Sequence, residues 1–126
     1  MNIRFLTPTL HGVVDYLAAA ALLTMPFVLG LGASAPLAKG LAVGTGLAVI
    51  VTSLLTDYKY GAVRILPFKG HLAIDTAVAI AFALAPSLLG FTGLDAWYYW
   101  LNSAAVFAVV ALSETGEASQ PSPVHA

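Results

Sequence analysis

The spacing of the charged residues constrains this chain more than any other feature. Five basic and six acidic residues in 126 leave four uncharged stretches of 23, 17, 19 and 18 residues. An α-helix rises 1.5 Å per residue, so roughly 20 residues cross the 30 Å hydrocarbon core of a bilayer. The sequence shows no sustained alternation of apolar and polar residues, which is the pattern that would indicate strands. We therefore expect an all-α membrane protein with four transmembrane helices, near 9–30, 37–57, 70–90 and 95–114.

The composition excludes several classes of protein. Apolar residues make up 60% of the chain and charged residues 9%, against about 45–50% and about 25% in soluble domains. With five basic residues and a net charge of −1, the chain lacks the basic surface that nucleic acid requires. The absence of cysteine removes disulfides, thiolate metal sites and thiol catalysis. The expected partner is the lipid bilayer, with no nucleic acid.

The basic residues also predict an orientation in the membrane. We expect a single four-helix domain over 1–115 and a flexible polar tail over 116–126. One side of the predicted bundle carries only Lys39, whereas the other carries four basic residues, namely Arg4, Lys59, Arg64 and Lys69. By the positive-inside rule, both termini face the cytoplasm of a multi-pass protein in the cell's inner (cytoplasmic) membrane.

A cleaved secretory signal over 1–35 is a competing interpretation. Arg4, an apolar core and the small residues at 33–35 fit its pattern. However, His11 and Asp15 interrupt the apolar core, which is also longer than the usual 7–15 residues or so. We therefore expect the first segment to remain as a membrane helix.

The two halves of the chain align without gaps when one is shifted by 60 residues. Seven of the 20 positions in 11–30 are identical to those in 71–90. Four of the matches involve residue types that are less common here than Ala and Leu. They pair His11 with His71, Asp15 with Asp75, Pro26 with Pro86 and Gly30 with Gly90. A weaker match pairs Leu41, Ala48, Val49 and Ser53 with Leu101, Ala108, Val109 and Ser113. We infer a tandem duplication of a helical hairpin, with repeats of about 9–57 and 69–115.

The duplication places the His and Asp residues at one depth in the membrane. Each hairpin crosses twice, so both copies enter from the same side. A His and an Asp four residues apart share a helix face, and intramembrane carboxylates usually face the bundle interior and pair there. Asp57, at the end of the second helix, can join them. The expected cytoplasmic-side polar cluster is His11, Asp15, Asp57, His71 and Asp75.

The polar cluster supports three interpretations. In the first, the protein is non-enzymatic, alone or as a subunit of a larger membrane assembly, and the cluster fixes helix packing or senses protonation. In the second, His11 and His71 with Asp15 and Asp75 bind a metal or haem in a redox protein; Zn, Fe or Mn would suit these ligands. The third is a small ion or proton transporter, which four short helices favour least. The residues leave the cofactor open, and also whether the partners are further copies or other membrane subunits.

Gly40 and Gly44 form a G-x-x-x-G pattern in the second expected helix. Small residues at this spacing let membrane helices approach closely. We expect these two glycines to mediate helix packing, within the fold or with a second copy.

Five segments of the chain carry a family resemblance: 11–16, 56–58, 71–75, 26–30 and 86–90. In these segments the chain resembles the SPW-repeat family of small bacterial integral membrane proteins. The Ser-Pro-Trp triplet itself is not retained, since the corresponding residues are Met25-Pro26-Phe27 and Ala85-Pro86-Ser87. The resemblance implies four membrane helices and no assigned activity.

Overall fold

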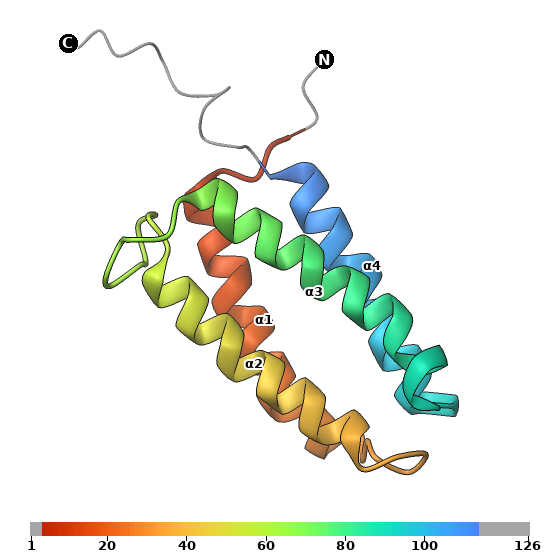
Figure 1. Ribbon diagram of the computed structural model, residues 1–126. Helices are drawn as coiled ribbons and strands as arrows, with labels where there is room; N and C mark the ends of the chain where they lie inside the picture. The colour runs from red at the N-terminus through yellow and green to blue at the C-terminus, as the bar shows by residue number, and fades with distance from the viewer. Residues whose placement is uncertain (1–3, 114–126) are drawn as a thin grey trace, which may run out of the picture.

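The computed structural model describes residues 4–113, which form four helices arranged as two antiparallel hairpins (Figure 1). The helices are α1 Pro8–Val28, α2 Leu37–Leu55, α3 Phe68–Leu89 and α4 Gly93–Leu112. The all-helical prediction is confirmed, and the observed bounds lie within two residues of the expected ones at most ends. The predicted polar tail, 116–126, lies outside the described residues.

The limits of the helices have local causes. The Thr7 hydroxyl caps α1 by accepting a hydrogen bond of 3.1 Å from the Leu10 N–H, and Pro8 occupies the first helical position. At the other end of the bundle, Gly30 and Gly90 have φ angles of 67° and 75°. A left-handed residue closes a helix and lets the chain turn, and glycine adopts it without steric cost.

Each helix packs along its partner within one hairpin. The long contacts are those of α1 with α2 and of α3 with α4, whereas helix backbones of different hairpins approach one another only at isolated positions. Gly46 brings α1 and α2 together, because a Cβ there would lie 3.0 Å from Cβ of Leu22. Gly40 and Gly44 instead face open space and make no such contact with any residue that the structure describes. Their packing against a second copy stays a prediction.

Three of the helices, α1, α2 and α3, are long and apolar enough to cross a membrane. Large apolar side chains point outward from them, as lipid-facing residues do; Leu17, Val28 and Leu88 are 66%, 74% and 75% exposed. The chain is therefore consistent with a multi-pass membrane protein.

The hairpins are joined at their turn end by buried polar and aromatic groups. The Asp95 carboxylate, 2% exposed, accepts hydrogen bonds from the Gly32 N–H at 2.9 Å, and from the N–H and hydroxyl of Ser34 at 2.9 and 2.5 Å. The Tyr99 hydroxyl donates to the Ala38 carbonyl at 2.6 Å. We call this set of contacts the turn joint.

The opposite end of the bundle carries the α2–α3 loop and both ends of the described chain (Figure 1). The Leu6 N–H donates to the Leu112 carbonyl at 2.9 Å, beside the end of α4. In the loop, the Asp57 N–H donates to the Leu66 carbonyl at 2.8 Å. This end is where the sequence predicts the polar cluster.

Candidate functional site

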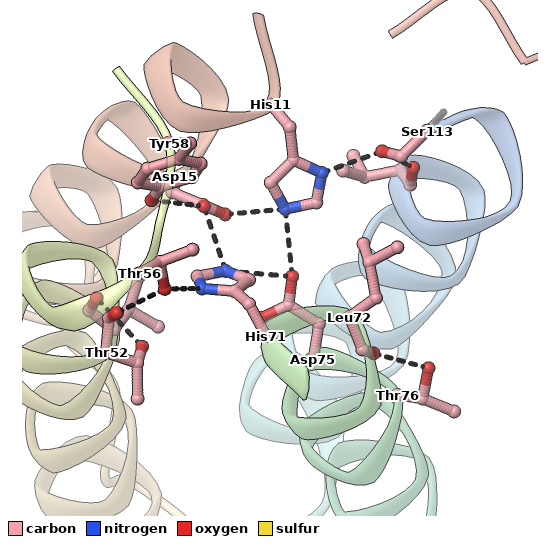
Figure 2. A network of polar contacts seen from close by, with 12 residues as sticks. His11, Asp15, Thr52, Thr56, Tyr58, His71, Leu72, Asp75, Thr76 and Ser113 are labelled. Atoms are coloured by element: carbon pink, nitrogen blue, oxygen red, sulfur yellow. Dashed lines mark hydrogen bonds and ion pairs between the residues drawn. The ribbon is translucent and has the colours of Figure 1, made fainter. Parts of the chain in front are cut away.

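The structure brings together four of the five residues expected in the polar cluster. α1 contributes His11 and Asp15, and α3 contributes His71 and Asp75, with the four side chains facing one another between the hairpins (Figure 2). Both histidines are fully buried. We refer to these four residues as the His/Asp cluster.

Each imidazole contacts the carboxylate of its own helix and that of the other hairpin. Nε2 of His11 lies 3.1 Å from Oδ1 of Asp15 and 3.0 Å from Oδ2 of Asp75. Nε2 of His71 lies 2.9 Å from Oδ2 of Asp15 and 3.3 Å from Oδ2 of Asp75. The contacts therefore form a closed ring that crosses between the hairpins twice.

The other nitrogen of each ring meets a hydroxyl at the end of a helix. Nδ1 of His11 lies 2.7 Å from Oγ of Ser113, after α4, and Nδ1 of His71 lies 2.7 Å from Oγ1 of Thr56, after α2. Both contacts are buried, and both join one hairpin to the other. Each imidazole is thus held from two sides.

These hydroxyls determine which ring nitrogen carries hydrogen. The Ser113 hydroxyl donates to the Val109 carbonyl at 2.5 Å, and the Thr56 hydroxyl donates to the Thr52 carbonyl at 2.5 Å. A hydroxyl has a single hydrogen, so each must accept from the imidazole beside it. Nδ1 therefore bears hydrogen in both rings. Nε2 then presents a lone pair to the carboxylates when the ring is neutral and donates to them when it is protonated; the contact of His11 Nε2 with Asp75 Oδ2, at 3.0 Å, has the geometry of a hydrogen bond.

Tyr58, in the α2–α3 loop, holds one of the carboxylates. Its hydroxyl donates to Oδ2 of Asp15 at 2.9 Å, and its ring lies 5.7 Å from that of His71 between centroids. Burial raises the pKa of the Tyr58 phenol. The phenol therefore keeps its proton and remains a donor to Asp15 at neutral pH.

Asp57 does not join the cluster. Its side chain is exposed in the loop, while its two neighbours, Thr56 and Tyr58, are buried against the cluster. Sequence reasoning missed these two residues and Ser113 as partners of the cluster. The available signal was their position: all three lie within one residue of the end of a predicted helix, at the membrane level of the histidines.

One buried nitrogen in the cluster has no hydrogen-bond partner among the described residues. Nε2 of His71 is enclosed, yet its contacts with the two carboxylates lack hydrogen-bond geometry despite their short distances. A buried polar atom left in this way is uncommon in folded proteins. The nitrogen lies within reach of both carboxylates without being aligned with either, whereas Nε2 of His11 is aligned with Oδ2 of Asp75.

The geometry does not suit a haem between the two histidines. Their rings lie 5.3 Å apart between centroids at an angle of 89°. Bis-histidine ligation needs the two Nε2 atoms on opposite faces of a flat macrocycle, whereas Asp15 and Asp75 occupy the space directly beside both atoms. The haem part of the second interpretation is therefore not supported by these residues.

A cavity of about 130 Å³ lies next to the cluster, between the hairpins. Asp15, Asp75 and Asn102 supply its polar lining, and the rest is mostly apolar, including Leu22 and Phe82. Both carboxylates therefore border a space within the bundle, on the side that leads toward the turn joint.

Comparisons with known proteins add no assignment. No family model matches the chain, and no similar protein was found among curated proteins or solved structures. The resemblance to the SPW-repeat family stays a prediction.

Proposed function

We propose that this chain is a multi-pass membrane protein without catalytic activity, in which the His/Asp cluster holds the two hairpins together. The observation that carries the proposal is the closed ring of contacts, in which His11 reaches Asp75 and His71 reaches Asp15. Each hairpin thus supplies one imidazole and one carboxylate to the other. Such an arrangement fits a connection between hairpins better than a cleft open to substrate.

The energetics favour a connecting role for the cluster. Polar contacts between membrane helices average only about 0.6 kcal/mol each, but hydrogen bonds to charged groups are worth about 1.5–3 kcal/mol. Two imidazole–carboxylate contacts, His11 with Asp75 and His71 with Asp15, join the hairpins here, where helix backbones of different hairpins otherwise approach only at isolated positions. The ring is therefore expected to supply much of the attraction between the hairpins at this end.

The proposal includes a membrane crossing by α4. Its 20 residues span about 30 Å at 1.5 Å per residue. Its buried polar groups are paired inside the bundle: Asp95 and Tyr99 in the turn joint, and Ser103, whose hydroxyl donates to the Ala79 carbonyl at 2.6 Å. The outward residues are apolar or aromatic, with Trp97, Trp100, Leu101 and Phe107 among them. These features support contact with lipid.

We also propose that the hairpins arose by tandem duplication, as the sequence predicts. Two pairs of equivalent contacts support this. The Leu31 N–H donates to the Pro26 carbonyl at 2.9 Å, as the Phe91 N–H donates to the Pro86 carbonyl at 3.0 Å. Nδ1 of His11 meets Ser113, as Nδ1 of His71 meets Thr56. In this pairing the counterpart of Ser113 is Thr56, not Ser53, so the second hairpin is three residues shorter after its glycine turn. An experimental structure with Thr56 and Ser113 at unlike positions would contradict it.

The orientation proposed is the one that the basic residues predict. The cluster end carries Lys59 and Arg64 in the exposed loop, and Arg4, whose guanidinium donates to the Ser113 carbonyl at 3.0 Å. The turn end carries Lys39. The positive-inside rule then puts the cluster at the cytoplasmic face of an inner membrane.

The connecting role is tested by neutralising one carboxylate in metal-free protein. We expect Asp75→Asn to lower the free energy of unfolding in detergent by about 2 kcal/mol, because it weakens charged contacts with both imidazoles. Chelator is present throughout, and unfolding is followed by circular dichroism. Asp57→Asn is the matched control: its side chain is exposed, so the change should stay within about 0.5 kcal/mol. Equal stability of the two variants would contradict the proposal.

A further inference from the structure

We propose that the His/Asp cluster is a binding site for one divalent first-row transition metal ion. The ligands would be Nε2 of His11 and His71 and one carboxylate oxygen each from Asp15 and Asp75, atoms that all lie within 4.8 Å of one another. The inference rests on the proposed function only in using the same four residues.

The orientation of the donors is the first argument. Since Nδ1 of each ring donates to Ser113 or Thr56, the Nε2 lone pairs of neutral imidazoles point at carboxylate oxygens. Two lone-pair acceptors at such distances repel unless a proton or a metal cation lies between them. With neutral imidazoles the four groups carry two negative charges, which one divalent cation balances.

The enclosed nitrogen of His71 is an independent observation. Nε2 is buried and has no hydrogen-bond partner in the described part of the chain, while its side chain is 1% exposed. A protonated imidazole would be expected to direct this N–H along a hydrogen bond to one of the carboxylates. A lone pair aimed into a set of further ligand atoms is instead what a metal ion requires.

The distances match a metal coordination polyhedron. Zinc binds imidazole nitrogen and carboxylate oxygen at about 2.0–2.2 Å in tetrahedral sites, which places neighbouring ligand atoms roughly 3.3 Å apart. The four contacts between imidazole and carboxylate measure 3.1, 3.0, 2.9 and 3.3 Å. The two contacts of Asp15 involve different oxygens, and one ligand atom from each residue lies within 4.8 Å of the other three, so the wider pairs would close around an ion while the shorter ones open by a few tenths of an ångström.

The groups around the cluster supply the support that metal ligands need. Metal-binding histidines almost always donate their second N–H to an acceptor, which fixes the tautomer and the ring orientation. Ser113 and Thr56 serve this purpose, and Tyr58 donates to the carboxylate of Asp15.

The ligand set limits the kind of metal. Two imidazoles and two carboxylates without thiolate suit Zn, Mn or Fe rather than softer ions. Four protein ligands leave no open position in a tetrahedral site, which is the pattern of structural zinc. We therefore infer an ion that strengthens the link between the hairpins, not one that binds substrate.

Zinc titration of the purified full-length chain tests the inference. After treatment with chelator, the wild-type protein in detergent should bind one zinc ion per chain by calorimetry and elemental analysis. Asp75→Asn removes a ligand charge and should lower zinc affinity by a hundredfold or more. Thr56→Val keeps all four ligands but removes the acceptor for His71, and should lower it about 10–100-fold. Asp95→Asn changes a buried carboxylate at the turn joint, at the other end of the bundle from the cluster. The zinc affinity of this variant should therefore equal that of wild type.

A second measurement covers the case in which the cluster variants do not fold. X-ray absorption of zinc-loaded wild type should show only N and O ligands at about 2.0–2.1 Å with the scattering pattern of two imidazoles. A folded wild-type chain that takes up no zinc, or zinc held without imidazole, would overturn the metal site. The connecting role is measured without metal, through Asp75→Asn against Asp57→Asn, so the two proposals can fail separately.

Discussion

At the scale of single residues, two hydroxyls determine the chemistry of two histidines. Thr56 and Ser113 each use their only hydrogen on a helix carbonyl and so accept from Nδ1. Without them, either ring could rotate or change tautomer, and Nε2 would have no fixed role. The position of one hydrogen atom thus decides whether the cluster presents lone pairs or N–H groups to its carboxylates.

The first prediction at this scale concerns Thr56. Thr56→Val keeps the shape of the side chain but leaves the Nδ1–H of His71 buried without an acceptor, which costs about 1–3 kcal/mol. We expect that loss in the free energy of unfolding of metal-free protein, measured by chemical denaturation in detergent. Thr52→Val is the control, because the Thr52 hydroxyl donates to the Val49 carbonyl of its own helix and, among residues 4–113, has no hydrogen bond to the cluster. A loss of similar size in both variants would show that the imidazole contact contributes nothing.

At the scale of the helices, the α1–α2 contact depends on one missing side chain. Gly46 is buried, and a Cβ there would lie 3.0 Å from Leu22 and 3.1 Å from side-chain atoms of Leu23. Gly40, on the same helix, has nothing within 4 Å of the corresponding point. The two glycines are therefore alike in sequence but unlike in role.

This difference predicts opposite outcomes for one substitution. Gly46→Leu should force α1 and α2 apart and destabilise the protein by about 1–3 kcal/mol or more, since overpacking strains a filled interface. Gly40→Leu adds a side chain into open space, so monomer stability should change little or rise with helix propensity. Thermal unfolding in detergent at low protein concentration distinguishes the two. A stable Gly46→Leu variant would contradict the packing described.

Helix limits and the meeting of the histidines with Asp15 and Asp75 were predictable from the sequence. The lengths of the uncharged stretches predict the number of helices, and the four-residue spacing of His11 and Asp15 predicts that they lie on the same helix face. The roles of Asp57 and its neighbours were not predictable, because the path of the chain after α2 decides which of three consecutive residues turns inward. The choice of Gly46 over Gly40 similarly depends on how α2 is rotated against α1, which an apolar sequence does not specify.

At the scale of the whole molecule, polar groups join the hairpins at both ends and a cavity lies between. The His/Asp cluster lies at the loop end and the turn joint of Asp95 with Ser34 at the other. Between them, Asp15, Asp75 and Asn102 border the cavity of about 130 Å³. Connections at both ends fix the relative position of the hairpins without tight packing along their full length.

The proposed membrane arrangement predicts which sites are accessible from each side. The chain contains no cysteine, so single cysteines report position without background. Thr92→Cys should react with a membrane-impermeant maleimide in intact cells, whereas Lys59→Cys and Ala111→Cys should react only after permeabilisation. Reaction of Ala111→Cys without reaction of Lys59→Cys in intact cells would show that α4 does not cross, and reaction of both would reverse the orientation.

The pairing of Leu6 with Leu112 has a consequence for the order of the chain. Because these residues are hydrogen bonded at 2.9 Å, and Arg4 contacts the Ser113 carbonyl, a short linker can connect the two ends of the described part of the chain. A circular permutant opened in the exposed loop between Val63 and Arg64 would then be synthesised with its second hairpin first. Every contact of the His/Asp cluster and the turn joint would remain available, since neither depends on which hairpin leaves the ribosome earlier.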